Sequence, residues 1–266
     1  MQAHKYTFGR VLVLAGSDHF LGAAVLCTGG ALRAGAGLVT VGSTAAVRMT
    51  VAARLPEATF TVRDVDQDAS TAAPYLSSHN SLVIGPGLGR GPSATSYVRD
   101  VLRQRQEPTV VDADALFALS EMPDWQSLVG PHTILTPHAG ELARLAGEPG
   151  DEPPWVVAGR LARQWNCVLI NKGPFTCVAA PDGQVHVWPR ANPALATGGT
   201  GDVLAGVCGG LLAQGCSAFD AARLAVGVHA LAAERLVSRR GWRTLLASDL
   251  FDEIPALLAE LATRRR

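Results

Sequence analysis

Short, wholly apolar runs alternate with helix-patterned segments along the first half of this chain, and this alternation limits the folds open to it. Residues 11–15 form an apolar run closed by Gly16-Ser17, and residues 22–34 then place alanine, valine and leucine at helical spacing. A run that is apolar at every position is typical of a strand buried on both faces of a parallel sheet. Because parallel neighbours need a crossover connection, the pattern predicts strand–helix–strand units.

The alternation continues, and three helical segments finish the chain. We expect further strands at residues 38–41, 81–84, 109–111 and 133–135, and helices at 93–104, 114–120, 202–214, 218–237 and 248–262. Ser217 and Ser248 are plausible N-caps of the last two helices. Apolar runs at 167–171, 176–180 and 184–188 follow one another, the last two joined by a Pro-Asp-Gly turn suited to a hairpin. The sequence therefore predicts an α/β fold with a mostly parallel sheet and an antiparallel hairpin at one edge.

Composition favours one domain and argues against two classes of partner. Of the 266 residues, 48% are hydrophobic, which is enough for the core of a single domain over 1–266, with residues 148–154 as a surface loop. Lys plus Arg and Asp plus Glu number 23 each, so no net field recruits nucleic acid or an anionic membrane. Residues 264–266, all arginine, are expected to form a solvated tail. We see no signal peptide or membrane helix, which predicts a cytoplasmic location.

The cysteines indicate neither a disulfide framework nor a metal centre. They are odd in number, lie mostly within apolar segments and lack paired metal-ligand spacing. We expect reduced, buried thiols at Cys27, Cys167, Cys177, Cys208 and Cys216.

A glycine-rich turn near the C-terminal third runs directly into a helical segment. The backbone N–H groups of residues 198–201 can converge on one anion, and the following helix adds the positive end of its dipole. Asp202 stands at the junction. A carboxylate repels a bound phosphate, but in a phosphoryl-transfer site it can orient or deprotonate an attacking hydroxyl. The alternative role of Asp202 is to cap the helix.

Polar groups also follow several of the expected strands directly. The glycine turn 85–89 follows one strand, Asp112 and Asp114 follow the next, and His138 follows a third. Since open α/β sheets bind ligands at the carboxyl ends of their strands, these groups are expected at one shared edge. The two carboxylates could hold Mg²⁺ through waters, and Lys172 could complement a phosphate. Each group has a structural alternative, namely a tight turn, a helix cap or a solvated lysine.

Taken in order, these motifs resemble those of the ADP-dependent NAD(P)H-hydrate dehydratases, from about residue 5 to the final helix. The matching segments are Ala15-Gly16-Ser17 with Gly22-Ala23-Ala24, residues 32–39, residues 55–59, residues 85–89, Asp112 to Leu116, Leu135 to His138, Lys172-Gly173 with Thr176, and residues 198–206. The ordered combination is far more specific than any one of its motifs.

The resemblance implies a ribokinase-like fold, a three-layer α/β/α arrangement around a mostly parallel sheet. It implies repair of hydrated NADH or NADPH, whose ring has added water, at the expense of ADP or ATP, with AMP and phosphate as the products from ADP. It further implies Mg²⁺, a homotetramer, and action on the S epimer. A chain of this length leaves no room for an epimerase domain, so a separate epimerase is expected to supply that epimer.

The same resemblance assigns the site residues. The hydrated dinucleotide is bound by Ala23, Gly87, His138 and Asp202, and the adenine nucleotide by Lys172, Gly173, Pro174, Phe175, Thr176 and Gly201. No residue is assigned as a direct metal ligand. Asp202 is the expected catalytic residue, acting on the ring hydroxyl that attacks the terminal phosphoryl group of ADP. Because a helix N-terminus lowers the pKa of an aspartate, we expect Asp202 to be a weak base that acts through its position.

Some positions depart from the family pattern, and two other functions stay open. Tyr6, Phe117, Ala139 and the pair Ala194-Leu195 replace residues that are common in the family, although none removes a proposed catalytic group. One rival function is an ATP-dependent kinase of a small vitamin-precursor alcohol, since its Gly-Thr-Gly-Asp loop would look alike. The other is a nucleotide sensor without catalysis.

Overall fold

The computed structural model describes residues 4, 6–62, 69–148 and 150–263, and these residues form a nine-stranded sheet. The strand order is β3-β2-β1-β4-β5-β6-β7-β8-β9. The strands are β1 (Arg10–Leu14), β2 (Leu38–Ser43), β3 (Thr59–Val62), β4 (Ser81–Ile84), β5 (Thr109–Val111), β6 (Thr133–Leu135), β7 (Val168–Asn171), β8 (Cys177–Ala179) and β9 (Val185–Val187). Strands β1 to β7 are parallel, whereas β8 pairs antiparallel with β7 and β9. The predicted mixed sheet is confirmed.

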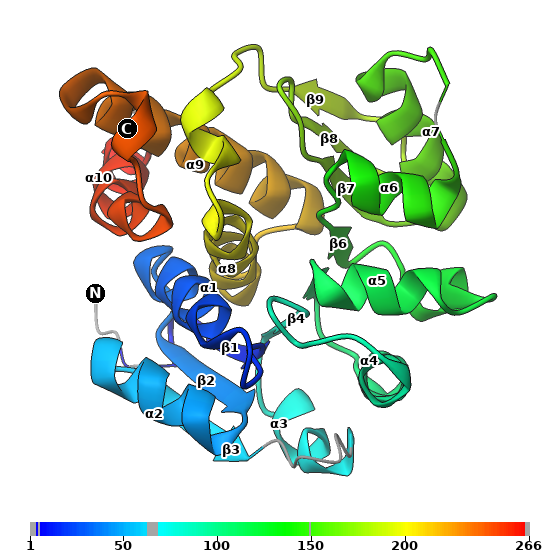
Figure 1. The fold of residues 1–266 in the computed structure, drawn as a ribbon, viewed down its shortest axis with the longest axis vertical. Coiled ribbons are helices and arrows are strands. Elements are labelled where there is room, and N and C mark those ends of the chain that lie inside the picture. The colour runs from blue at the N-terminus through cyan, green and yellow to red at the C-terminus, as the bar shows by residue number, and fades with distance from the viewer. Residues whose placement is uncertain (1–3, 5, 63–68, 149, 264–266) are drawn as a thin grey trace.

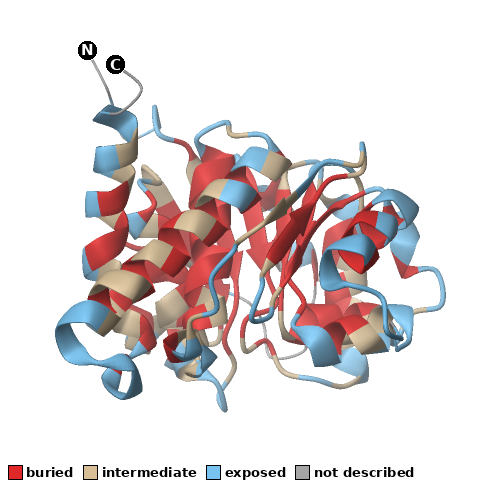
Figure 2. Ribbon diagram, turned by 90° about the horizontal axis from the view of Figure 1, so that it is seen from above, coloured by how far each residue is buried: buried red, intermediate tan, exposed pale blue. Residues whose placement is uncertain are grey.

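Helices cover both faces of the sheet and make a three-layer fold (Figure 1). One face packs against α1 (Leu21–Arg33), α2 (Ala45–Arg54), α8 (Thr200–Ala213), α9 (Ala218–Arg240) and α10 (Leu250–Thr263). The other packs against α3 (Ala73–Leu76), α4 (Pro92–Gln104), α5 (Asp114–Ser120), α6 (Ala139–Ala146) and α7 (Pro154–Trp165). Strand β1 shows why its sequence is apolar at every position. Val11 and Val13 face the first group of helices, and Leu12 and Leu14 face the second. Figure 2 shows the buried strands between the two helical layers.

Several elements differ from the sequence-based expectation. Strand β3 was not predicted, because it lies at the sheet edge and mixes polar with apolar residues. Helices α2, α6 and α7 were also not predicted. Ser217 caps α9 as expected, its Oγ accepting from the backbone N–H of Asp220 at 3.1 Å. Ser248 as a cap is wrong. It lies inside a short 3₁₀ turn, and the carboxylate of Asp249 instead accepts from the backbone N–H of Leu246 at 2.8 Å.

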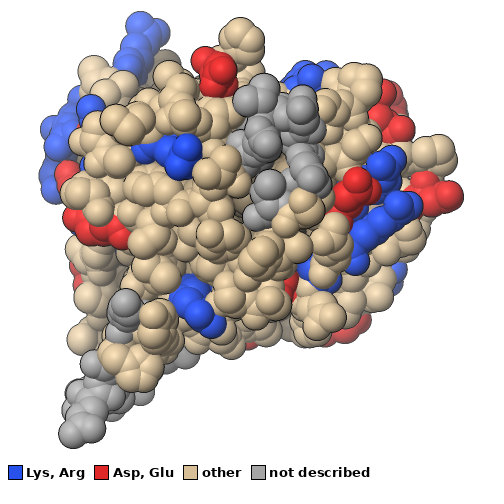
Figure 3. Space-filling model, turned by 90° about the horizontal axis from the view of Figure 1, so that it is seen from below, with Lys and Arg blue, Asp and Glu red and all other residues tan. Residues whose placement is uncertain are grey.

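The structure also bears on the expectations for the cysteines, for membrane helices and for surface charge. All five cysteines are free and four of them are buried, while Cys216 is partly exposed. None of the helices in the described ranges is long and apolar enough to cross a membrane. On the face shown in Figure 3, the described basic and acidic side chains are interspersed over a largely uncharged surface. The arginines 264–266 lie outside the described residues.

Helices α1 and α8 approach each other closely, and this contact sets the position of the glycine-rich turn before α8. A methyl group built on Gly206 would lie 2.0 Å from the carbonyl oxygen of Cys27, and one on Gly30 would lie 2.4 Å from that of Val203. Only glycine permits backbones to lie this close. The start of α8 is therefore held against α1 rather than carried on a free loop.

Replacing Gly206 by alanine should lower the free energy of unfolding by about 1–3 kcal/mol, because the added methyl group must push the two helices apart. The matched control is Gly227→Ala in the middle of α9, where the nearest atom to an added methyl group is 3.5 Å away. Urea unfolding of both variants measures the difference. Equal stability of the Gly206 variant and the control would contradict the close packing of α1 on α8.

Candidate active site

The expected polar groups gather where the parallel strands end, and the N-terminus of α8 reaches the same place. Lys172 directly follows β7, and its Nζ lies 3.3 Å from the position of a methyl group built on Gly201, in the first turn of α8. Its backbone N–H donates to the carbonyl of Pro137 at 2.8 Å, which joins the end of β7 to the end of β6. Lys172 thus lies beside the glycine-rich turn.

The first turn of α8 is braced from within the protein. Gly199 is the N-cap residue, with a left-handed φ of 90°, and Thr200 Oγ1 donates to the carbonyl of Leu195 at 2.8 Å. His229 Nε2 donates to the Thr200 carbonyl at 2.9 Å. Burial lowers the pKa of His229 to about 4, so this ring is a neutral donor at physiological pH. The N–H groups at the start of a helix have no partner within it, which suits an anion site, although that of Thr200 donates to the Thr197 carbonyl at 3.4 Å.

Asp202 does not cap α8, and its acidity differs from the expectation. Gly199 is the N-cap, and no side chain makes a capping hydrogen bond at this helix start. Burial, then the charge of Asp112, raises the pKa of Asp202 to about 7, although Lys172 acts in the opposite direction. The predicted lowering by the helix end is wrong, because desolvation and neighbouring carboxylates outweigh the helix dipole. A carboxyl group with this pKa is half ionised near neutral pH and is a useful general base.

A buried ion pair lies beside Asp202. Asp112, which is 1% exposed, accepts from Lys172 Nζ at 2.9 Å and from Thr136 Oγ1 at 2.6 Å through the same oxygen, Oδ1. Burial alone would lower the pKa of Lys172, but the charges of Asp112 and Glu141 outweigh it and raise that pKa. Lys172 is therefore a permanent cation held at the start of α8. The sequence indicated Asp112 and Lys172 separately, but it did not show that they pair.

Replacing Thr136 by valine, which has nearly the same shape, should destabilise the fold by about 1.5–3 kcal/mol, because Asp112 loses a hydrogen bond to a charged group. The conservative variant Thr136→Ser keeps the hydroxyl and is expected to recover most of this loss. Chemical denaturation of the two variants at neutral pH gives the comparison. If valine and serine cost the same, the hydroxyl does not stabilise Asp112.

His138 has a clear structural role. It is the N-cap of α6, with Nδ1 accepting from the backbone N–H groups of Gly140 at 3.0 Å and Glu141 at 3.2 Å. The Glu141 carboxylate in turn accepts from the His138 backbone N–H at 2.9 Å. The spacing His-x-x-Glu is the signal of such a capping box. The side chain of His138 is 58% exposed at the carboxyl end of the sheet. Its role in binding the substrate stays a prediction.

The other expected site residues fall into two groups. Gly87 and Ala23 are neighbours, since a methyl group on Gly87 would lie 2.7 Å from Cβ of Ala23. The loop 173–176 after Lys172 is mostly exposed, and its Phe175 is 49% exposed. Thr176 Oγ1 donates to the Gly173 carbonyl at 3.1 Å and closes this loop. Their binding roles remain predictions.

The two expected Mg²⁺-binding carboxylates point to different partners. Asp114 accepts from the Gly89 backbone N–H at 3.0 Å and from Arg90 Nε at 2.8 Å, whereas Asp112 pairs with Lys172. Ala113 between them has a φ of 51°, a strained value for a residue with a side chain. No cluster of three or more potential metal ligands occurs within the described part of the chain.

The chain is similar in sequence to the proteins of one enzyme family. The sequence pattern of the NAD(P)H-hydrate dehydratase family matches residues 11–256. An ADP-dependent (S)-NAD(P)H-hydrate dehydratase of Bacillus subtilis is 38% identical over 258 residues, covering 96% of this chain and 90% of that protein. A bifunctional NAD(P)H-hydrate repair enzyme of Moorella thermoacetica is 40% identical over 270 residues, covering 97% of this chain but 51% of the relative. The chain thus spans about half the length of such bifunctional relatives.

Solved structures agree with the sequence comparison. The Bacillus subtilis ADP/ATP-dependent NAD(P)H-hydrate dehydratase, co-crystallised with ATP and Mg²⁺, superimposes with a TM-score of 0.82 at 32% identity over 97% of this chain and 92% of that one. A ribokinase-like superfamily protein of Enterococcus faecalis gives a TM-score of 0.87 at 26% identity over 97% and 89%. The expected ribokinase-like fold is confirmed.

Proposed function

Because the chain belongs to the NAD(P)H-hydrate dehydratase family, we propose that it converts the S epimer of hydrated NADH or NADPH back to the reduced cofactor at the expense of ADP. The products are the reduced cofactor, AMP and phosphate. One observation supports this most strongly. Asp202, with a pKa raised to about 7 by burial, lies in the first turn of α8, where we expect an anion to bind, beside the cation Lys172. A base and a phosphoryl site thus share one location. We treat residues 1–266 as one catalytic domain.

The two groups of residues match the two substrates. ADP is assigned to Lys172, the loop 173–176 and Gly201, because a cation lies beside the first turn of α8 and the loop after it exposes an aromatic ring. The hydrated dinucleotide is assigned to Ala23, Gly87, His138 and Asp202. This division follows the order of the strands, because the segment after β7 carries all of the first group except Gly201, and the segments after β1, β4 and β6 carry most of the second.

In the proposed reaction, Asp202 accepts the proton of the ring hydroxyl as that oxygen attacks the terminal phosphorus of ADP, and AMP leaves. The phosphate ester then departs with the C–O bonding electrons, assisted by the lone pair of the ring nitrogen. Loss of a proton from the neighbouring carbon restores the double bond. Phosphorylation is needed because hydroxide is a poor leaving group. The N–H groups of the first turn of α8 and Lys172 would stabilise the transferred charge.

Mg²⁺ fits the chemistry of this site. Asp112 Oδ1 is occupied by Thr136 and Lys172, whereas Oδ2 accepts no hydrogen bond from the described residues. Carboxylate oxygens are typical ligands of this ion, so Asp112 is the residue that we expect to hold it through water. When bound, the ion would neutralise charge on the phosphate groups.

Several further properties remain part of the proposal. The protein is expected to act in the cytoplasm as a homotetramer, without nucleic-acid or membrane partners. Its substrate epimer would be supplied by an NAD(P)H-hydrate epimerase. The bifunctional relatives support this coupling, because their names describe two activities for NAD(P)H-hydrate repair.

A direct assay tests the proposed function. Hydrated NADH and ADP are incubated with the protein, the absorbance at about 340 nm is followed, and AMP and phosphate are quantified. The proposal predicts a gain of absorbance that depends on ADP, with AMP and phosphate formed in equal amounts. Parallel assays with ATP and with hydrated NADPH define the preferences. No gain in absorbance, with phosphorylation of a thiazole or pyrimidine alcohol by ATP instead, would identify a kinase.

The pH dependence of kcat/KM should report the ionisation of Asp202. Burial raises the pKa of this carboxyl to about 7, and only its ionised form accepts a proton. Activity should therefore rise with pH through neutrality and level off above the pKa, falling about tenfold per unit below it. The profile is measured at saturating ADP between roughly pH 5.5 and 8.5. A rate that is constant over this range would show that ionisation of Asp202 does not limit the reaction.

A further inference from the structure

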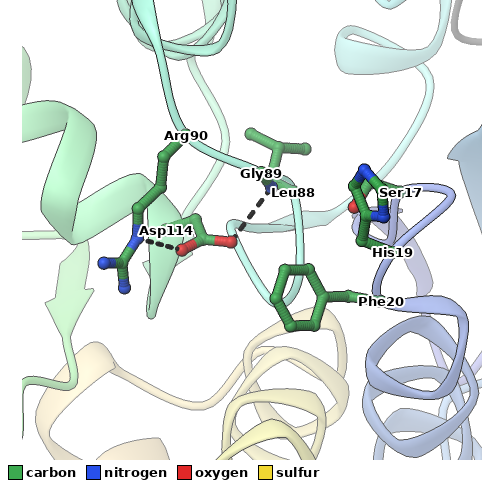
Figure 4. A pocket seen from close by; sticks show the side chains of 7 residues that line it. All are labelled: Ser17, His19, Phe20, Leu88, Gly89, Arg90 and Asp114. Atoms are coloured by element: carbon green, nitrogen blue, oxygen red, sulfur yellow. Dashed lines mark hydrogen bonds and ion pairs between the residues drawn. The ribbon is translucent and has the colours of Figure 1, made fainter.

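A cavity of about 500 Å³ opens at the carboxyl end of the sheet, on the side away from the proposed ADP loop. It is lined by Ser17, His19 and Phe20 after β1, residues 88–90 after β4, and Asp114 at the start of α5 (Figure 4). Its volume is within the range of roughly 300–1,000 Å³ that is common for small-molecule sites. A methyl group on Gly87 would lie 2.7 Å from Cβ of Phe20, so the cavity adjoins the proposed dinucleotide residues.

The strand order places this cavity in line with the reaction centre. At the carboxyl end of the sheet, the loops after β1, β4, β5, β6 and β7 lie side by side in this order. The proposed ADP loop is the one after β7. Asp202 lies within electrostatic range of Asp114 after β5 and of Lys172 after β7. If the hydrated ring reacts at Asp202 with ADP on the β7 side, the loops after β5, β4 and β1 offer a path for the rest of the dinucleotide. This step rests on the proposed function.

The lining of the cavity has a cationic end and an aromatic end. Arg90 Nε pairs with Asp114 at 2.8 Å, and the guanidinium lies 4.7 Å from the ring centroid of Phe117. This arrangement fixes Arg90 while its two terminal nitrogens make no described hydrogen bond. It also gives a role to Phe117, a departure from the family pattern. In the view of Figure 4, Arg90 and Phe20 lie on opposite sides of Asp114. Phe20 is 55% exposed.

One buried polar atom beside the cavity has no partner among the described residues. Ser17 Oγ is buried, and it makes no hydrogen bond with any described residue. A buried hydroxyl without a partner is costly unless a ligand or water satisfies it. Asp114 does not oppose an anion strongly, because Arg90 and the Gly89 backbone N–H both pair with it and 10% of its side chain is exposed. The cavity therefore offers a cation and an aromatic face to one ligand.

We infer that this cavity binds the adenosine phosphate half of the hydrated dinucleotide. Arg90 pairs with the phosphate groups, and Phe20 packs on the adenine ring. Arg90 and Phe20 are then determinants of substrate specificity, since they make the protein prefer a dinucleotide to a mononucleotide that carries the same hydrated ring.

A truncated substrate tests this inference. Hydrated NADH and hydrated reduced nicotinamide mononucleotide carry the same reacting ring, but the second lacks the adenosine half. Calorimetry without ADP measures the binding of each hydrate with no turnover. The wild-type protein should bind the truncated hydrate about 100-fold more weakly. Arg90→Gln should weaken the binding of hydrated NADH about tenfold and change that of the truncated hydrate less than about twofold.

Two further variants act as controls. Arg160→Gln removes an arginine that is 50% exposed and pairs with Glu152 at 2.8 Å, much as Arg90 pairs with Asp114, and it should change neither affinity. Phe20→Leu should weaken only the binding of hydrated NADH. Phe175→Leu, an aromatic residue of similar exposure at the ADP side, should instead raise the KM for ADP equally with both hydrates. Melting temperatures check that each variant is folded.

The possible failures are distinct. Equal binding of the two hydrates by the wild-type protein would overturn the inference while leaving the proposed function intact. An equal loss of both affinities in Arg90→Gln would also overturn it, because Arg90 would then act only by holding Asp114. If neither hydrate binds and no turnover occurs with ADP, the proposed function is refuted.

Discussion

Replacing Asp202 by asparagine is expected to lower kcat by about two to four orders of magnitude, with little change in the affinity for ADP. Asparagine keeps the shape and the position of the side chain, but it cannot take the proton of the ring hydroxyl. Lys172 and the N–H groups of α8 remain in place, so the nucleotide should still bind. Steady-state assays at pH 8 give kcat, and calorimetry with ADP gives the affinity.

Asp220→Asn is the matched control, because Asp220 has the same place in α9 that Asp202 has in α8, the third residue after the N-cap. Asp220 is exposed and pairs with Arg223 at 3.0 Å. Its replacement should leave kcat unchanged, since its charge lies on the surface. Near-normal turnover of the Asp202 variant would remove this residue from the chemical step.

Replacing Lys172 by methionine should affect both stability and nucleotide binding. The side chain of Asp112 is 2% exposed and would be left as an unpaired buried charge, at a cost of about 3–5 kcal/mol in the free energy of unfolding. The loss of the cation beside Gly201 should raise the KM for ADP by about tenfold or more. Urea denaturation and steady-state kinetics measure the two effects separately.

The second change Asp112→Asn separates the two roles of Lys172. In the double variant no buried charge is left unpaired, so most of the lost stability should return, whereas the KM for ADP should stay high. Arg190→Met serves as a control, because the exposed Arg190–Glu234 pair is expected to contribute about 0–1 kcal/mol. If methionine at 172 costs no more than methionine at 190, Asp112 does not depend on Lys172.

Much of the fold follows from local sequence patterns. Strands β4, β5 and β6 were predicted at their observed bounds, because they are buried on both faces and read as apolar runs after a first serine or threonine. Strand β3 lacks this signal because it is an edge strand with exposed positions. Ser248 resembles a cap in sequence, but Asp249 makes the hydrogen bond, and only the path of the chain decides between them.

The residues of the candidate site could be predicted from the sequence, but their electrostatic interactions could not. The ends of neighbouring parallel strands share an edge, so the convergence of Asp112, His138 and Lys172 followed from the order of motifs. The pKa of Asp202 did not, because it depends on burial and on the charge of Asp112, which comes from a distant part of the chain. The contact of Arg90 with Phe117 likewise exists only in the folded protein.

The most direct test of the account follows the oxygen atom that water added to the nicotinamide ring. Hydrated NADH prepared in ¹⁸O-labelled water carries the label in the ring hydroxyl, and the reaction with ADP is run in ordinary water. If this hydroxyl attacks ADP at Asp202, the label must leave with the phosphate, and mass spectrometry should find it in nearly every phosphate formed. Unlabelled phosphate, formed while NADH is regenerated, would show that water attacks ADP and would contradict the account.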